Sequence, residues 1–175
     1  MSDPFVVLVG ASGAGKTTVG RALAEALGGG FVDSDDLLAD AAGIPLDQVM
    51  IDLGEPGYRE LERDAVARAL ATSGSVVAVG AGAVADDVTR QRLSSVPVAW
   101  LRVSAANAAN RSGLNAPRPV GLGNVRATLA ALMAAQAPNY ADVADIVVET
   151  DFRSVADIAS EIRTSLDLKG SARAE

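Results

Sequence analysis

A glycine-rich loop between an apolar run and a helical pattern constrains this chain more than any other feature. The loop covers residues 10–17 and has the sequence GASGAGKT, directly after the apolar run FVVLV. This matches the pattern G-x-x-x-x-G-K-[ST], in which backbone N–H groups and the positive end of the next helix surround phosphate groups. Lys16 is expected to reach the β- and γ-phosphates, and the Thr17 hydroxyl to contact Mg²⁺. A plain glycine turn is the alternative, but the order of strand, loop and helix favours a nucleotide site.

Composition narrows the classes of partner and of chemistry. The chain has 175 residues, enough for one domain with a substantial core, and 15 basic against 22 acidic residues give a net charge of −7. This balance opposes binding to nucleic acid or to an anionic membrane. Cysteine and histidine are both absent, so disulfides and thiolate metal sites are excluded and carboxylates must manage any proton transfer. No signal peptide or membrane span is evident, and we expect a cytoplasmic monomer.

Strand patterns alternate with helix patterns along the chain. Strands are expected near residues 5–9, 31–32, 75–79, 96–103 and 145–149. Helices are expected at 16–27, 37–42, 46–53, 58–71, 86–93, 104–110, 124–136 and 154–168, with turns at 54–57 and at Pro138. The alternation predicts an α/β fold, with a parallel sheet between helical layers and right-handed crossovers. One domain over residues 1–168 and a frayed tail over 169–175 complete the expected organisation.

Acidic residues follow the second predicted strand. Asp33 and Asp35 are separated by one residue, so in an extended segment both would point the same way. They lie at the carboxyl end of a strand, where ligands of open α/β sheets bind. With no histidine in the chain, this pair is the best source of a Mg²⁺-organising carboxylate and of a base for a substrate hydroxyl. The alternative is a helix cap followed by first-turn acids, a role we assign to Asp36.

Two further charge patterns indicate substrate contacts. Arg59 and Glu62 lie three residues apart at the start of a helix, so the carboxylate can orient the guanidinium to grip a substrate carboxylate, although a solvated surface pair is the alternative. Between residues 103 and 141 there is no acid, but Arg111, Arg118 and Arg126 fall there. Such a segment suits a mobile lid over a polyphosphate, expected at about residues 111–124. A chance absence of acids from an alanine-rich stretch is the alternative.

Several of these elements occur together in a known family. They are FVDSD at residues 31–35, GE at 54–55 followed by YR at 58–59 and Glu62, GAG at 80–82, RP at 118–119 and APNY at 137–140. In this order, and over nearly the whole chain, they resemble the shikimate kinases. The resemblance implies the nucleoside monophosphate kinase fold, a three-layer P-loop architecture with a five-stranded parallel sheet and a mobile lid. It also implies transfer of the γ-phosphate of ATP, with Mg²⁺, to a hydroxyl of a small cyclic polyhydroxy acid, shikimate first.

The resemblance also implies roles for individual residues. Nucleotide contacts are expected from Gly13, Ala14, Gly15, Lys16, Thr17 and Thr18, with Arg111 and Arg153 flanking the adenine. Asp33 and Thr17 are expected to organise Mg²⁺, and Arg118 to contact the transferring phosphate. Asp35 is expected to hold the reacting hydroxyl and Arg59 the substrate carboxylate. Gly80, Ala81, Gly82 and Gln136 are expected to line the acceptor site, with Lys16, Asp35 and Arg118 as the catalytic residues.

This chain departs from the family pattern at two acceptor positions. Ala81 stands where the family's glycine loop normally has its middle glycine, and Gln136 stands where the family has an arginine that binds the substrate carboxylate. Losing one charged hydrogen bond of roughly 1.5–3 kcal/mol weakens carboxylate binding by about ten- to a hundredfold. Two alternatives therefore stay open: a related kinase whose acceptor is another polyol or sugar acid, and a nucleotide-binding protein without kinase activity.

Overall fold

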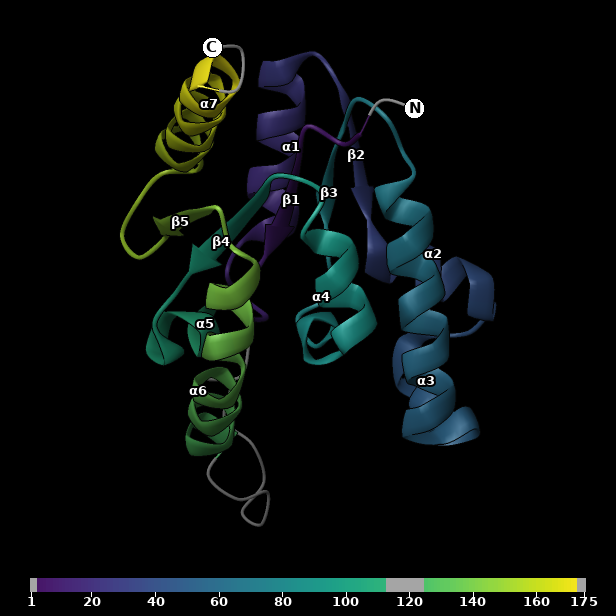
Figure 1. The fold of residues 1–175 in the computed structure, drawn as a ribbon. Helices are drawn as coiled ribbons and strands as arrows, with labels where there is room; N and C mark the ends of the chain where they lie inside the picture. The colour runs from purple at the N-terminus through teal and green to yellow at the C-terminus, as the bar shows by residue number, and fades with distance from the viewer. Residues whose placement is uncertain (1–2, 113–124, 173–175) are drawn as a thin grey trace.

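A five-stranded parallel sheet forms the centre of the protein (Figure 1). The computed structural model describes residues 3–112 and 125–172. The strands are β1 (Val6–Val9), β2 (Gly30–Asp33), β3 (Ser75–Ala78), β4 (Val98–Arg102) and β5 (Ile146–Glu149), in the order β2-β3-β1-β4-β5. Because all of them are parallel, their carboxyl ends meet at one edge, as the alternating pattern predicts.

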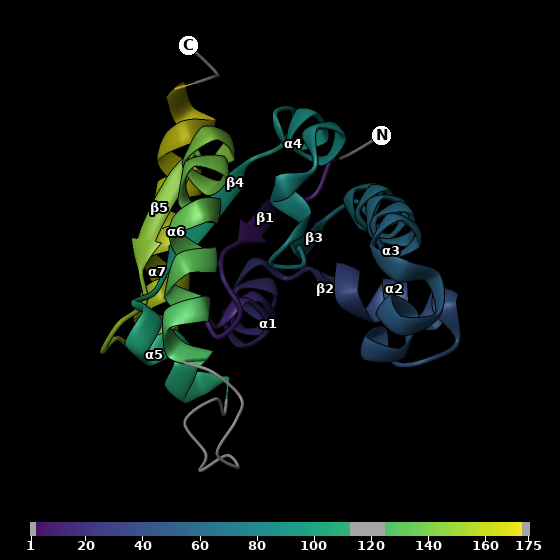
Figure 2. The same cartoon turned by 90° about the horizontal axis from the view of Figure 1, so that it is seen from below.

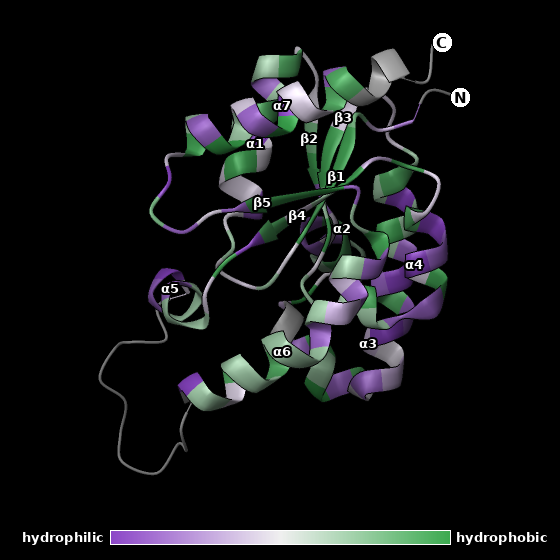
Figure 3. Ribbon diagram, turned by 60° about the vertical axis from the view of Figure 1, so that its left-hand side comes forward, coloured by the Kyte–Doolittle hydropathy of each residue, from purple (hydrophilic) through white to green (hydrophobic). Residues whose placement is uncertain are grey.

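The sheet is apolar on both faces because helices cover both. Every residue of β1 is buried, and Val7 lies opposite Val77 on one neighbouring strand and Val98 on the other. Strands enclosed in this way are continuous runs of valine and leucine rather than alternating polar patterns. Strands β1 and β3 are accordingly buried along their whole lengths, whereas β2, β4 and β5 end in a charged residue at the carboxyl edge (Figure 3).

Two helical layers enclose the sheet. Helices α1 (Lys16–Leu27) and α7 (Val155–Ala172) cover one face, where Leu23 and Ile162 are fully buried (Figure 3). The other face carries part of α3 (Leu46–Leu70) together with α4 (Asp87–Leu93) and α6 (Val125–Val143). The three-layer α/β arrangement is thus confirmed.

Two groups of helices lie on opposite sides of the start of α1 (Figure 2). On one side α2 (Ser34–Ala42) packs against α3, with Leu38, Val49 and Ala65 forming a small separate core. On the other side are α5 (Ala105–Arg111) and α6, which contact each other. The loop after β1 therefore lies between the pair α2–α3 and the pair α5–α6.

The helix boundaries differ from the prediction in places. Helix α2 begins at Ser34, earlier than expected, and a short 3₁₀ turn, η1 (Ala83–Ala85), follows the glycine loop after β3. Helix α3 runs across the expected turn, although Gly54 has non-helical torsions (φ 65°, ψ 179°), so the predicted break survives as a kink. Helix α7 continues to Ala172, so residues 169–172 are helical rather than a frayed tail.

Helix α6 passes through Pro138, where the sequence predicted a turn. Proline has no N–H and normally interrupts a helix, but local preference is a weak guide when tertiary contacts oppose it. Beyond the proline, Tyr140 stacks on Trp100 with ring centroids 5.6 Å apart, and its hydroxyl donates to the Ala81 carbonyl at 2.6 Å. These contacts hold the last turns of α6 against the sheet.

Most of the expected lid lies outside the described residues, and the expectation about membrane spans is addressed only for the described part of the chain. Residues 113–124 of the expected lid, including Arg118, lie outside the described part of the chain. Within that described part, we find no helix with the length and apolarity needed to cross a bilayer.

Candidate active site

The phosphate-binding loop joins β1 to α1 at the carboxyl edge of the sheet. Gly10, Gly13 and Gly15 have φ values of 146°, 79° and 94°, which side chains rarely tolerate. Gly13 is also closely packed, because a Cβ atom there would lie 2.5 Å from the Ala108 carbonyl oxygen on α5. Backbone conformation therefore favours glycine at all three positions, and lack of space requires it at Gly10 and Gly13 as well.

Lys16 turns its ammonium group back over this loop. Nζ donates to the carbonyl oxygens of Gly10 at 2.7 Å and Ala11 at 3.1 Å. Burial of the ammonium lowers the Lys16 pKa from 10.5 to about 8, while the carboxylates of Asp35 and Asp33 act in the opposite direction. The cation is thus held at the place where phosphate groups would bind.

Asp33 joins the phosphate loop to the start of α2. Its Oδ2 accepts a hydrogen bond from the Thr17 hydroxyl at 3.0 Å, and its Oδ1 accepts from the Asp35 backbone N–H at 3.1 Å. The helix cap is therefore Asp33, and the assignment of that role to Asp36 is wrong: Asp36 is an exposed acid in the first turn. The neighbouring hydroxyl and carboxylate oxygens of Thr17 and Asp33 are ligands of the type Mg²⁺ prefers.

Asp35 lies over the glycine loop that follows β3. A Cβ atom at Gly80 would lie 2.5 Å from Asp35 Oδ1, so the carboxylate touches this backbone. The Gly80 N–H donates to the buried Ser34 hydroxyl at 3.0 Å, which fixes the start of α2 against the loop. Burial raises the Asp35 pKa, with a further contribution from Asp33, while Lys16 opposes the rise. A carboxylate so placed is a stronger base than one in water.

Arg59 and Glu62 form an ion pair beside the same loop. Arg59 Nη1 donates to Glu62 Oε2 at 2.6 Å, and the Glu62 residue is only 3% exposed. The solvated-pair alternative is therefore wrong for Glu62. A Cβ atom at Gly82 would lie 2.9 Å from Arg59 Nη1, so the guanidinium is close to the glycine loop. Burial raises the Glu62 pKa, while its bond to Arg59 opposes the rise.

A pocket of about 150 Å³ lies between the phosphate loop, the glycine loop after β3 and helix α6. It is lined by Ala11, Ser12, Arg59, Ala81, Gly82, Leu129, Leu132, Met133, Gln136 and Tyr140. Both positions that depart from the family pattern, Ala81 and Gln136, are thus in its wall. In addition, Asn139 Nδ2 donates to Gln136 Oε1 at 3.1 Å.

Sequence reasoning missed several of these contributions. The apolar residues of α6 were expected only as part of an alanine-rich helix, and the Tyr140 bond to Ala81 joins residues far apart in the chain. The APNY element at residues 137–140 did indicate that the region of Tyr140 belongs to the site, but it did not indicate which residue Tyr140 contacts.

The remaining predicted residues lie outside this pocket. Arg111 is on the α5 side of the phosphate loop, and Arg153 is beside α7. Arg111 Nη2 donates to the Thr150 carbonyl at 2.9 Å, and its Nη1 approaches the Gly13 carbonyl at 3.5 Å. Arg153 pairs with Glu161 of α7 at 2.6 Å. Thr18 and Arg126 are exposed, on the first turns of α1 and α6.

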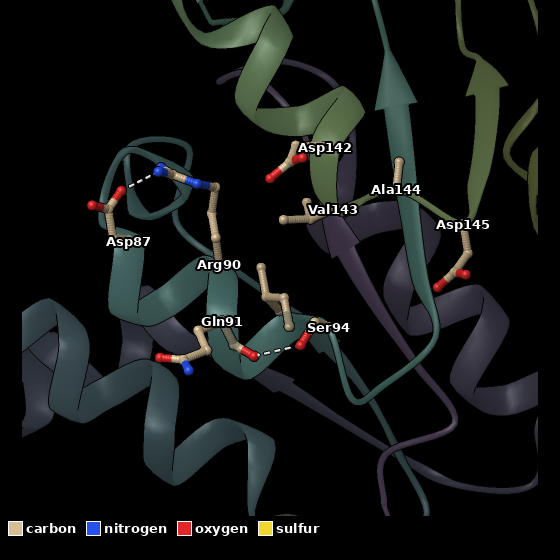
Figure 4. A pocket seen from close by; sticks show the side chains of 9 residues that line it. Asp87, Arg90, Gln91, Ser94, Asp142, Val143, Ala144 and Asp145 are labelled. Atoms are coloured by element: carbon tan, nitrogen blue, oxygen red, sulfur yellow. Dashed lines mark hydrogen bonds and ion pairs between the residues drawn. The ribbon is translucent and has the colours of Figure 1, made fainter.

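A larger pocket, of about 480 Å³, is remote from these groups (Figure 4). It lies where α4 ends and where α6 leads into β5, at the amino ends of β4 and β5. Its lining includes Asp142, Asp145 and the ion pair between Arg90 and Asp87. Since the strands are parallel, this is the edge of the sheet opposite to the phosphate loop.

Comparison with known proteins identifies the family. The shikimate kinase family model matches residues 12–167. The protein belongs to the shikimate kinase family. A shikimate kinase from Salinispora tropica is 47% identical over 163 residues, which cover 93% of this chain and 98% of the relative. One from Thermobifida fusca is 43% identical over 169 residues, covering 97% and 98% of the two chains.

A solved structure agrees with this placement. The shikimate kinase from Acinetobacter baumannii in complex with shikimate has a TM-score of 0.87 and 31% identity, covering 97% of this chain and 95% of that one. The predicted fold class is therefore confirmed. Shikimate kinases are ATP-dependent phosphotransferases that act on a hydroxyl group, so the prediction of an enzyme of this class is confirmed as well.

Proposed function

We propose that the protein transfers the γ-phosphate of ATP to a hydroxyl of shikimate, forming shikimate 3-phosphate and ADP. The observation that carries this proposal is the position of Asp33, whose carboxylate contacts Thr17 of the phosphate loop and the backbone of Asp35. Donor and acceptor groups are thereby brought to one edge of the sheet. Membership of the shikimate kinase family supports shikimate as the acceptor.

On the donor side, the triphosphate binds to the backbone of residues 13–18. Lys16 exchanges its bonds with the Gly10 and Ala11 carbonyls for the β- and γ-phosphate oxygens. Arg111 and Arg153 flank the adenine, and Arg118 contacts the transferring phosphate. Catalysis here is positioning and charge stabilisation rather than covalent chemistry.

Thr17 and Asp33 are the residues that would hold Mg²⁺. Their oxygens already lie within 3.0 Å of each other, and Mg²⁺ in kinases is commonly held by one or two protein ligands plus phosphates and water. When bound, the ion neutralises charge that develops on the phosphate oxygens. The loop backbone and Lys16 supply the rest of that stabilisation from the protein.

On the acceptor side, Asp35 orients the hydroxyl and accepts its proton. The hydroxyl oxygen forms a bond to the γ-phosphorus while the bond to the β-phosphate oxygen breaks and ADP leaves. Arg59 contacts the carboxylate end of the substrate, and the backbone of residues 80–82 together with Gln136 lines its remaining surface. The raised pKa of Asp35 favours proton uptake at the moment of transfer.

The test is ADP release with and without shikimate, with the phosphorylated product identified by mass spectrometry. The Asp35→Asn variant is expected to lose activity by roughly 10²–10⁴-fold, the contribution of a positioned base, with the KM for ATP little changed. Asp36→Asn is the matched control, because Asp36 is exposed in the same helical turn and is expected to keep its activity.

The alternatives have distinct outcomes in this assay. Tight ATP binding without turnover on any acceptor would indicate a nucleotide-binding protein without kinase activity. Turnover on another polyol or sugar acid, with shikimate inert, would keep the kinase and change its acceptor. The single domain over residues 1–168, the lid, the monomeric state and the cytoplasmic location remain predictions of the sequence.

A further inference from the structure

The pocket of about 150 Å³ between the phosphate loop, the glycine loop after β3 and α6 is called the acceptor pocket below. It contains little positive charge that is not already paired with a carboxylate. Of the described residues that line it, Arg59 is the only cation. Its guanidinium is bonded at 2.6 Å to Glu62, and Glu55 lies 3.9 Å away. Because Glu62 is almost completely buried, water screens this pair weakly. A substrate carboxylate at Arg59 therefore meets a cation whose charge is largely compensated.

A second carboxylate adds to this effect. At Gly80 a Cβ atom would lie 2.5 Å from Asp35 Oδ1 and 3.5 Å from Glu62 Oε1, so both acids face the same short piece of backbone. Burial raises the pKa of Glu62, and the Asp35 carboxylate raises it further, as expected where two acids approach each other in a partly buried site. An additional negative charge brought into this space is opposed by the same repulsion.

Gln136 offers the pocket a neutral donor in place of a charge. Asn139 Nδ2 donates to Gln136 Oε1 at 3.1 Å, which occupies the amide oxygen. The Gln136 NH₂ group then remains for a ligand, and it can donate equally to a carboxylate, an amide carbonyl or a hydroxyl oxygen. The hydrogen bond from Asn139 thus holds the neutral amide of Gln136 in place on the pocket wall.

The rest of this wall is apolar. Leu129, Leu132 and Met133 line the pocket from the same helix as Gln136. Such side chains do not compensate the loss of water by a charged group, whereas a neutral substituent is desolvated at much lower cost. Apolar residues, a neutral amide and a compensated arginine together favour a ligand with reduced charge.

We propose that this pocket accepts uncharged acceptors: hydroxylated six-membered rings that carry a carboxamide, ester or hydroxymethyl group where shikimate carries its carboxylate. The inference rests on the proposed function, since it concerns the acceptor of the same phosphate transfer. A neutral analogue makes a weaker hydrogen bond to Arg59 than a carboxylate does. It also avoids the free-energy cost of removing a negative charge from water beside Glu62 and Asp35. We expect kcat/KM for the neutral analogue to lie within about tenfold of that for shikimate.

The experiment compares shikimate with its primary amide and its methyl ester in the ADP-release assay. In the Gln136→Arg variant, the added cation should raise kcat/KM for shikimate by about ten- to a hundredfold, mainly through KM, and leave the amide little changed. Gln91→Arg is the matched control, because it adds the same charge on α4, in the pocket at the opposite edge of the sheet. It should leave the ratio of the two substrates unaltered.

The outcomes separate the two proposals. If the enzyme phosphorylates shikimate but prefers it over both neutral analogues by more than about tenfold in kcat/KM, the inference is overturned and the proposed function stands. If the amide is phosphorylated and shikimate is inert, the inference is supported and shikimate is replaced as the acceptor. If none of the three supports ADP formation, both proposals fail. An equal rise for shikimate in the Gln91→Arg and Gln136→Arg variants would also overturn the inference.

Discussion

At the scale of single residues, the position of Lys16 makes nucleotide binding depend on pH. Its pKa is lowered to about 8 in the folded protein, so the ammonium is lost as the pH rises through that value. Since the phosphates need the charged form, ADP affinity should fall by about fivefold between pH 8 and pH 9. Isothermal titration calorimetry over pH 7–9.5 measures this.

A charge that does not titrate provides the control for Lys16. The Lys16→Arg variant stays protonated in this range and should bind ADP with a flat pH profile, whatever its affinity. The contribution of Lys16 to the free energy of unfolding changes with pH in the opposite direction to the ADP affinity. Between its pKa of about 8 in the folded protein and the ordinary pKa of 10.5, the unfolded chain binds more protons than the folded one, so this contribution rises with pH. An ADP affinity that is constant up to pH 9.5 in the wild type would contradict the prediction.

Phe152 is a second residue with a measurable local cost. It has a φ of 57°, in the left-handed region, and is 95% exposed. A bulky side chain pays about 1 kcal/mol in this conformation, whereas asparagine tolerates it better. The Phe152→Asn variant should therefore be more stable by about 0.5–1 kcal/mol, which corresponds to a rise in Tm of roughly 1–4 °C. Differential scanning calorimetry checks this value.

Leu168→Asn is the control for Phe152→Asn. Leu168 is also exposed but lies in helix α7, where asparagine is a poorer helix former than leucine. This variant should be slightly less stable than the wild type. A decrease in Tm for both variants would show that the backbone at residue 152 is not strained.

At the scale of secondary-structure elements, helix α6 and the glycine loop after β3 are joined by one hydrogen bond. The Tyr140 hydroxyl donates to the Ala81 carbonyl, and both residues line the acceptor pocket. In Tyr140→Phe the stack on Trp100 is kept and only this bond is lost. The KM for the acceptor should rise by about three- to tenfold with the KM for ATP unchanged, at a cost of about 1 kcal/mol in stability.

Ser75→Ala separates the effect on the pocket from the effect on stability. Ser75 donates to the Thr72 carbonyl at 2.7 Å at the amino end of β3, away from the acceptor site. Its loss should cost a similar free energy of unfolding and leave both KM values unchanged. Steady-state kinetics and urea unfolding of the two variants decide between a positioning role for Tyr140 and a merely structural one.

At the scale of the whole molecule, nucleotide binding should stabilise the fold because the phosphate loop contacts several elements. Gly13 packs against α5, and Thr17 is bonded to Asp33 at the start of α2. At a concentration one hundred times the Kd, Mg²⁺-ADP adds about 2.7 kcal/mol, or roughly 5–10 °C in Tm for a chain of this size. Differential scanning fluorimetry measures the shift, and it should shrink when EDTA removes the metal. An EDTA-insensitive shift would count against the metal site at Thr17 and Asp33.

Much of the architecture could be predicted because it depends on local patterns. The phosphate loop, the acids after β2 and the alternation of strands with helices all follow from short stretches of sequence. The errors lie where distant contacts outweigh local preference, as at Pro138 inside α6. For the same reason the donation from Tyr140 to Ala81 and the burial of Glu62 could not be predicted, since they depend on how α6, α3 and the β3 loop pack together.

The bonds from Lys16 to the Gly10 and Ala11 carbonyls also have a kinetic consequence. They join the Lys16 side chain to the backbone of the phosphate loop, so the shape of the loop is supported by its own hydrogen bonds. Nucleotide association should then be limited by encounter and by the exchange of two hydrogen bonds, and it should proceed in a single phase whose rate rises linearly with nucleotide concentration. Differences in affinity among loop variants should accordingly appear mainly in the dissociation rate.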